Sequence, residues 1–373
     1  MERMLPVKKA SQWALGVVGW VGLILGLGSQ AAHAEQLRLY GFVDTSFFYE
    51  NLTESNTFSL DQVELDIEAQ LTPWAGLRTD INFLAGDSDN TGLGVDDPFD
   101  ELTTDEVLEQ GYIFLKLPLP FETTFRFGKF NAPIGWELLD PPDLYQFSNS
   151  LTFNFGIPTN LTGTLLVMTF NPVFDLQIYV VNGWDQLRDN NKMKTFGGRL
   201  GIAPMQGVNV GLSAITGPEQ DDNDSDYRTV FDMDFTVSLI AKLLMGGEFN
   251  YGHEEDAALD GSNAHWVSGF MTLHYDFTDV IGLTLRGGAF YDDGGSRLPN
   301  DNPAVEKQTS YELTLAPTFA LSKGVGMLVE FRYDKSDKDV FLDDDGDFQD
   351  DIFSVAVELT FVWEKTLDIL VKN

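Results

Sequence analysis

The sequence of 373 residues contains no cysteine, which excludes disulfide frameworks, thiolate metal sites and thiol catalysis. Positive charge is also scarce. Its 23 Lys and Arg residues stand against 58 Asp and Glu, for a formal net charge of −35. This balance argues against a nucleic-acid partner, because nothing would offset repulsion from the phosphates. Beyond residue 34, no apolar run is long enough for a membrane-spanning helix.

The first 34 residues have the pattern of a secretory signal peptide. Basic residues occur within the first nine positions, an apolar stretch follows at 13–28, and Ala-His-Ala stands at 32–34. The alternative is an N-terminal membrane anchor, but the apolar stretch is shorter than the ~20 residues that a spanning helix needs. We therefore predict that residues 1–34 are cleaved during export.

Alternation of apolar and polar residues dominates the rest of the chain. The stretch VELDIEAQL at 63–71 alternates with a period of two, and 229–239 and 327–334 repeat the pattern. Such a period predicts a strand with one apolar and one polar face. The pattern alone does not say which face is inside the protein.

The lengths of the connections indicate which face is inside. We predict strands at 37–49, 57–72, 75–86, 107–117, 121–131, 161–171, 174–184, 194–203, 207–217, 227–239, 241–252, 264–277, 281–292, 308–320, 324–334 and 352–363. Short and long connections alternate between them, which is typical of a transmembrane antiparallel β-barrel with short periplasmic turns and long external loops. The expected fold is thus all-β, with about 16 strands over residues 35–363 and a short tail at 364–373. The apolar faces would contact lipid, and the polar faces would line a water-filled lumen.

Aromatic residues fit this membrane arrangement. Trp74 and Trp363 fall near the predicted periplasmic strand ends, and Trp184 and Trp266 near the external ends. These are the heights of the aromatic girdles of membrane barrels.

Several stretches resemble a known family. They are LYGFVDTSFFY at 39–49, GKFNAPIGWELLDPPD starting at Gly128, VVNGWDQLRDNNKMKTFGGRLGIAP at 180–204 and GPEQDDNDSDYRTVFD at 217–232. The chain resembles the putative β-barrel porin type 2 family of Gram-negative outer membranes. The resemblance implies an outer-membrane pore that passes small hydrophilic solutes or ions by diffusion. Likeness to sixteen-stranded porins also implies a homotrimer, and the expected surroundings are outer-membrane lipid and lipopolysaccharide.

The longest connection, 132–160, follows the fifth strand. In sixteen-stranded porins this loop folds inward and narrows the pore. Here it contains several prolines, apolar residues and the acids Glu137, Asp140 and Asp143. The apolar content favours packing against the barrel wall, and an external cap is the alternative. We predict that these three acids line the constriction.

Charged residues on the predicted wet face would share in this constriction. The basic ones near mid-strand are Arg78, Arg126, Arg199 and Arg286. Acids on the same face would give the pore a transverse field, or the pairs could simply stiffen the wall. Because the acidic balance is so large, we predict that the pore prefers cations.

The acidic stretch DDDGDFQDD at 343–351 lies in the last long loop. Asp343, Asp345, Asp347 and Asp351 have the spacing of short calcium-binding repeats, since Ca²⁺ prefers clustered carboxylate oxygens. The alternative is a solvated acidic loop. A weak external Ca²⁺ site is therefore a hypothesis, and the sequence implies no other cofactor.

The sequence gives little support to catalysis. After residue 34 the only histidines are His253, His265 and His274, and no Ser/His/acid order stands out. Three alternatives to a diffusion porin remain. They are a substrate-selective channel for a sugar or other nutrient, an outer-membrane lipid hydrolase, and a non-conducting adhesin barrel.

We expect the purified protein to be a heat-modifiable membrane barrel, because closed barrels resist unfolding until they are boiled. Unboiled and boiled samples should migrate differently on detergent gels, and circular dichroism in detergent should be dominated by strand. A soluble monomer without detergent would contradict this expectation.

Overall fold

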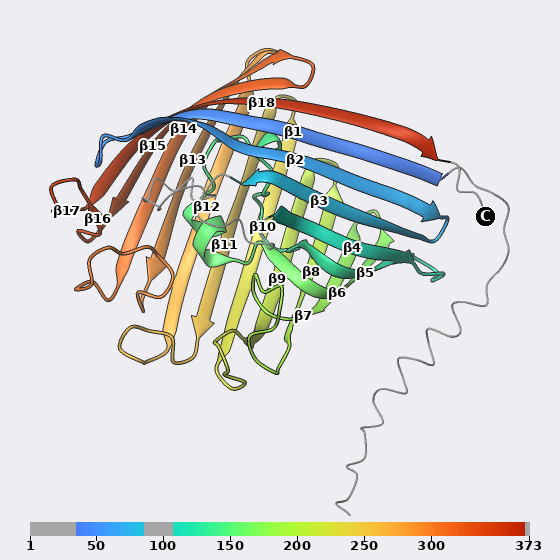
Figure 1. Ribbon diagram of the computed structural model, residues 1–373, viewed down its shortest axis with the longest axis horizontal. Helices are drawn as coiled ribbons and strands as arrows, with labels where there is room; N and C mark the ends of the chain where they lie inside the picture. The colour runs from blue at the N-terminus through green and yellow to red at the C-terminus, as the bar shows by residue number, and fades with distance from the viewer. Residues whose placement is uncertain (1–34, 86–106, 370–373) are drawn as a thin grey trace, which may run out of the picture. The chain divides into compact units, whose positions relative to one another are not determined.

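The protein is a closed antiparallel β-barrel of 16 strands (Figure 1). The computed structural model describes residues 35–85 and 107–369, so the predicted signal peptide and most of the loop after the third strand lie outside the described residues. The barrel strands are β1 (Glu35–Glu50), β2 (Asn56–Thr72), β3 (Ala75–Ala85), β4 (Leu108–Lys116), β5 (Glu122–Asn131), β6 (Asn160–Asn171), β7 (Phe174–Val181), β8 (Thr195–Met205), β9 (Val208–Pro218), β10 (Tyr227–Ile240), β11 (Leu243–Glu254), β12 (Ala264–Asp276), β13 (Ile281–Asp292), β14 (Gln308–Ser322), β15 (Val325–Ser336) and β18 (Asp351–Ile369). The predicted fold class and strand number are confirmed.

Each strand pairs with its neighbours in sequence, and β1 pairs with β18 to close the barrel. Within the last long loop, a small hairpin is formed by two short strands, β16 (Phe341–Leu342) and β17 (Phe348–Gln349). Closure matters in lipid, because an open sheet edge would leave backbone groups without hydrogen-bond partners.

On most strands the polar face is the inner one. β6 is an exception, because Leu161 and Leu165 point inward and belong to a buried apolar cluster with Phe153 and Ile157 of the long connection. On β14, Tyr311 and Leu313 are 52% and 54% exposed, whereas Glu312 and Thr314 between and beside them are 4% and 0% exposed. A soluble β-protein would show the reverse, with apolar side chains buried. The prediction of an apolar exterior and a polar lumen is therefore confirmed.

Among the described connections, the short turns lie at one end of the barrel and the long loops at the other, as the alternating lengths predicted. The turn between β14 and β15 shows how tight the short ones are. Gly324 has φ of +75°, and a Cβ there would lie 2.4 Å from the carbonyl oxygen of Val362. Glycine is required because both the conformation and the close approach exclude a side chain.

Two short helical turns occur in the connection between β5 and β6. The 3₁₀ turn η1 spans Pro141–Asp143, and α3 spans Leu151–Gly156 with Ser150 as its N-cap. The Ser150 hydroxyl accepts a hydrogen bond from the Phe153 N–H at 3.1 Å. In the described part of the chain, every helix is too short or too polar to cross a membrane.

The predicted boundary after Trp363 is wrong. β18 continues to Ile369, and its last residues pair with the first residues of β1, from Glu35↔Ile369 to Tyr40↔Glu364. The stretch beyond Trp363 therefore extends the last strand, because it supplies the hydrogen-bond partners that the start of β1 would otherwise lack.

The girdle prediction holds for only one end of the barrel. Trp74 and Trp363 are exposed on the outside, as expected. Trp184 and Trp266 are buried and pack edge to face, with ring centroids 6.3 Å apart. Trp266 shares its face with Ser268 on β12, so strand alternation directs it into the lumen whatever its height.

Removing residues 364–373 should destabilise the barrel, because the start of β1 would become an open edge. The expected loss is about 1 kcal/mol for each backbone hydrogen bond removed. The measurement is the midpoint of the heat-induced gel shift. Glu364→Ala is the control, since it removes only an exposed ion pair with Arg38. Equal midpoints for the truncated and wild-type chains would show that the extension adds no stability.

Candidate functional site

The 132–160 connection folds into the barrel, as predicted. Its backbone is hydrogen-bonded to side chains on the inner wall: Trp136 N–H donates to Glu248 at 2.7 Å, and Phe147 N–H donates to Glu330 at 3.1 Å. The Trp136 indole N–H donates to Thr236 at 2.9 Å. A Cβ on Gly246 would lie 2.1 Å from the Trp136 ring, so β11 accommodates the indole by having glycine there.

Two buried arginines on β13 and β15 hold the middle of the loop. Arg286 donates to Glu137 at 2.7 Å and to the Ser148 carbonyl at 2.6 Å. Arg332 donates to the Ser148 hydroxyl at 2.8 Å, and both arginines lie within 3.4 Å of Glu312. Guanidinium groups suit this role because their five donors can serve several acceptors at once.

This network changes the role predicted for Glu137. Its second carboxylate oxygen accepts from the Ser150 N–H at 2.8 Å, and the side chain is buried. Both oxygens are therefore used to fasten the loop. Arg286 neutralises the Glu137 charge, so Glu137 acts as an anchor of the loop, and its place in the constriction stays an untested prediction.

The other two loop acids face a different part of the wall. Asp140 and Asp143 line a cavity of about 200 Å³ together with residues of β1, β2 and β3. Those wall residues are Arg38, Tyr40, Asp66, Glu68 and Arg78. Asp143 is exposed to this space, whereas Asp140 is half-buried. The loop thus crosses the lumen from the wall of β10–β15 to the wall around β2, and these two walls are far apart in the strand order.

The remaining predicted arginines do not converge on one constriction. Arg78 pairs with Asp66 at 3.0 Å and with Asp80 at 2.9 Å. Arg199 forms an ion pair with Asp234 on β10. Arg126 lies over the Tyr112 ring, 5.0 Å from its centroid, a favourable cation–π arrangement. These side chains occupy the inner wall as predicted, but at separate places.

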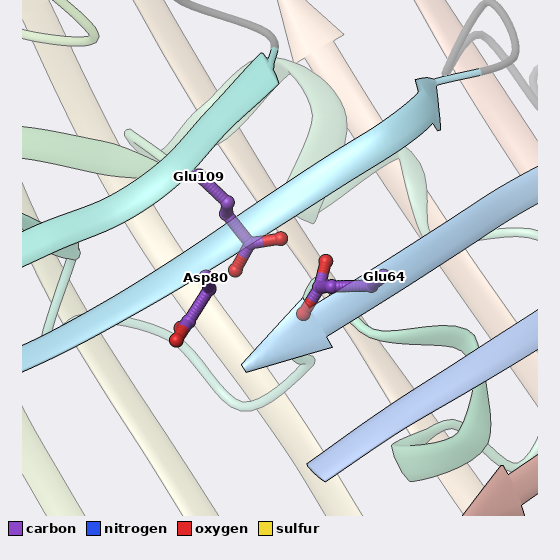
Figure 2. A group of neighbouring side chains, drawn as sticks. All are labelled: Glu64, Asp80 and Glu109. Atoms are coloured by element: carbon purple, nitrogen blue, oxygen red, sulfur yellow. The ribbon is translucent and has the colours of Figure 1, made fainter. Parts of the chain in front are cut away.

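Acidic residues accumulate on the wall formed by β2, β3 and β4. Figure 2 shows Glu64, Asp80 and Glu109 on three neighbouring strands, with the carboxylates of Glu64 and Glu109 turned toward one another. Asp140, the loop residue beside this group, has a raised pKa because it is buried and negative charge is crowded here. Burial, followed by repulsion from Glu109 and other carboxylates, raises the pKa of Asp140 to about 9.

A second anchor lies at the outer end of the loop and was not predicted. The Trp266 indole N–H donates to the Gly156 carbonyl at 3.3 Å, and Arg297 donates to the Phe155 carbonyl at 2.8 Å. The Arg297 guanidinium also lies 4.8 Å from the Trp184 ring centroid. The sequence signal for Trp266 was its position among the alternating polar residues of β12, which face the lumen. Arg297 lies in an external loop, where no sequence pattern marked it.

The acidic stretch in the last external loop is arranged differently from a metal site. Asp343 accepts hydrogen bonds from the N–H groups of Asp345 and Asp347 and from the Gln349 amide, and Asp351 accepts from the Tyr333 hydroxyl. Among the residues that the structure describes, the sets of three carboxylates close enough to share an ion lie elsewhere, in the lumen. Calcium binding by Asp343, Asp345, Asp347 and Asp351 stays an untested prediction.

A closed barrel with an apolar exterior, a charged lumen and an infolded loop defines the class of outer-membrane channels. The chain belongs to the family described as putative beta-barrel porin-2, OmpL-like, whose model matches residues 31–361. This confirms the family that the sequence resembles. A search of curated proteins gave no match.

Solved structures of outer-membrane proteins share the fold at low sequence identity. OmpT of Vibrio cholerae is 11% identical with a TM-score of 0.62, and the match covers 90% of this chain and 100% of the OmpT chain. The outer-membrane channel DcaP of Acinetobacter baumannii is 13% identical with a TM-score of 0.60, over 90% and 99% of the two chains. An anion-selective porin from Comamonas acidovorans is 11% identical with a TM-score of 0.62, over 88% and 100%. At these identities the likeness concerns the fold alone.

Replacing Arg286 should destabilise the protein strongly, because Glu137 and Glu312 would lose a buried partner. We expect Arg286→Met to cost about 3–5 kcal/mol, which is typical of breaking a buried ion pair. Arg38→Met is the control, since its ion pair with Glu364 is exposed and worth about 0–1 kcal/mol. Unfolding by guanidinium in detergent measures both. Similar losses in the two variants would contradict the anchoring role of Arg286.

Proposed function

We propose that this outer-membrane channel is a porin for passive diffusion of small hydrophilic solutes, and that it prefers cations. The observation that carries the proposal is the cavity between the loop tip and the β1–β3 wall. Its lining includes four acidic side chains, Asp66, Glu68, Asp140 and Asp143, and two guanidinium groups, Arg38 and Arg78. The raised pKa of Asp140 keeps it protonated at neutral pH, and the other three acids still outnumber the two guanidinium groups. A solute passing this place meets an excess of acidic groups, which favours cations.

The wall arginines oppose this preference less than their number suggests. Arg286 and Arg332 are buried in the loop anchor, and Arg199 is paired with Asp234. A guanidinium that is already paired adds little positive field to the open lumen. The remaining excess of carboxylates then sets the sign of the local potential.

Local charge should matter more than the external loops. The Debye length at physiological salt is about 8 Å, so carboxylates in distant loops are largely screened. The side chains facing the permeating ion are screened less. For the same reason, the selectivity of the structurally similar porin from Comamonas acidovorans need not apply here, because 11% identity leaves the charged lining free to differ.

The alternative functions make different demands. A substrate-selective channel would show saturable flux, whereas a diffusion pore would not. A lipid hydrolase needs an accessible nucleophile beside a histidine. His274 does lie 2.9 Å from the Thr284 hydroxyl and 3.2 Å from Asp276, but Thr284 is fully buried. This favours a non-enzymatic channel. A non-conducting adhesin barrel would carry no current.

We also propose that the channel assembles as a homotrimer in the membrane. The support is a solved trimer form of Vibrio cholerae OmpT, which shares the fold at 10% identity. Outer-membrane lipid would surround the trimer, and lipopolysaccharide would meet the external loops. Cross-linking in native membranes should trap a three-subunit species, and a ladder ending at the monomer would contradict the assembly.

Reversing one charge at the loop tip should weaken the cation preference. Asp143→Lys places a positive charge in the cavity, and we expect the reversal potential across a KCl gradient to shift toward anions, most clearly in dilute salt. The solutions contain EDTA so that no divalent ion occupies the lumen. Asp345→Lys in the last external loop is the matched control.

The control should shift the potential much less than Asp143→Lys. Equal shifts would place the selective region outside the loop tip. Anion preference in the wild-type channel would refute the charge argument as a whole.

A further inference from the structure

The inner wall opposite the main loop anchor carries a group of carboxylates that outnumbers the guanidinium groups in contact with it. Oxygens from Glu64, Asp66 and Asp140 lie within 4.8 Å of one another, and oxygens from Glu64, Asp80 and Glu109 form a second such set. Arg78 contacts only Asp66 and Asp80 of these five. Glu64 belongs to both sets, and Figure 2 shows its carboxylate turned toward that of Glu109.

The first set also contains carboxylate oxygens that have no hydrogen-bond partner among residues 35–85 and 107–369. Glu64 is 3% exposed and its Oε1 is unpartnered, and Asp66 is 7% exposed with its Oδ1 unpartnered. Asp140 Oδ1, from the loop, lacks a partner too. Gln62 donates to the other Glu64 oxygen at 2.8 Å, so only one oxygen of Glu64 is left over. Buried carboxylate oxygens are almost always hydrogen-bonded or coordinated, so three unpartnered atoms in one group call for a water or an ion.

The second set is better satisfied by protein groups. Asp80 accepts from Arg78 and from the Gln110 amide, and Glu109 accepts from the Asn131 amide at 2.8 Å. These partners leave Asp80 and Glu109 as a surrounding layer of negative charge. The three residues with free oxygens are therefore the ones placed to coordinate.

We propose that Glu64, Asp66 and Asp140 bind one divalent cation of the calcium class, which links the infolded loop to β2. Ca²⁺ takes oxygen ligands at 2.3–2.6 Å in irregular geometry, so two oxygens of one shell can lie about 4.8 Å apart. Mg²⁺ demands a tighter and more regular shell, which three carboxylates from two strand positions and a loop fit less well.

The position of this site gives the ion a structural consequence. The loop is fastened to β10–β15 by Glu248, Arg286, Glu330 and Arg332. Asp140 is its contact with the acidic group on β2. A bound ion would hold the loop at both sides of the lumen, and its loss would free the tip next to the proposed selective cavity. The binding itself does not depend on the pore's ion preference.

Calorimetry on the full-length barrel in detergent tests the proposal without passing current. EDTA-treated protein is titrated with CaCl₂ up to about 10 mM, since extracellular calcium sites can be as weak as ~10⁻³ M. Wild type should take up one Ca²⁺ per chain, and MgCl₂ should bind more weakly. The double variant Glu64→Gln/Asp66→Asn, and separately Asp140→Asn, should weaken binding about tenfold or more, because affinity follows the number of charged ligands.

Two controls separate this site from other acidic groups. Asp232→Asn removes a buried carboxylate, also with an unpartnered oxygen, from β10 across the lumen, and should leave Ca²⁺ binding unchanged. Asp345→Asn/Asp347→Asn tests the external loop. The gel shift on heating verifies folding of every variant, and Asp140→Asn changes only the loop. The proposal is overturned if wild type takes up no Ca²⁺, if the luminal variants bind as wild type does, or if only the external-loop variant loses the heat.

Discussion

Backbone hydrogen bonding without water is the constraint on which this structure depends. Within lipid, each strand must find partners on both sides, so β1 and β18 have to meet. This explains why the last strand runs on to Ile369. A boundary at Trp363 would have left the first residues of β1 paired on the β2 side only. In the closed barrel, alternation sends every second side chain into the lumen, and the lipid outside requires the outward set to be apolar.

The lumen is organised by how its buried charges are neutralised. On the β13–β15 side, Arg286 and Arg332 compensate Glu137, Glu312 and Asp334, and the same guanidinium groups hold the loop backbone. On the β2–β4 side, carboxylates outnumber the guanidinium groups that contact them. One wall therefore anchors the loop, and the other is the acidic surface on which the proposed cation preference and the proposed cation site depend.

The functional proposals follow from this asymmetry. A loop held on one side leaves its tip, with Asp140 and Asp143, against the acidic wall and a cavity of about 200 Å³. Selectivity and divalent binding would then arise from neighbouring groups but through different chemistry. Selectivity needs only a local excess of negative charge facing the permeating ion. Binding needs buried oxygens without partners, such as Glu64 Oε1.

The sequence by itself determined the barrel and its strand number, because alternation and connection length are local properties that lipid makes decisive. It favoured infolding of the long loop but left an external cap as the alternative, and the tertiary structure decided between them. Parity would also have placed Trp266 inside, had it been weighed above strand height. Only the tertiary structure decided which charges meet. Glu137 and Arg286 are 149 residues apart, and no periodicity encodes their contact. Closing the barrel and folding in the loop brought Asp140 to Glu64 and sent Glu137 to the opposite anchor, because contacts across a lumen depend on where the loop is fastened.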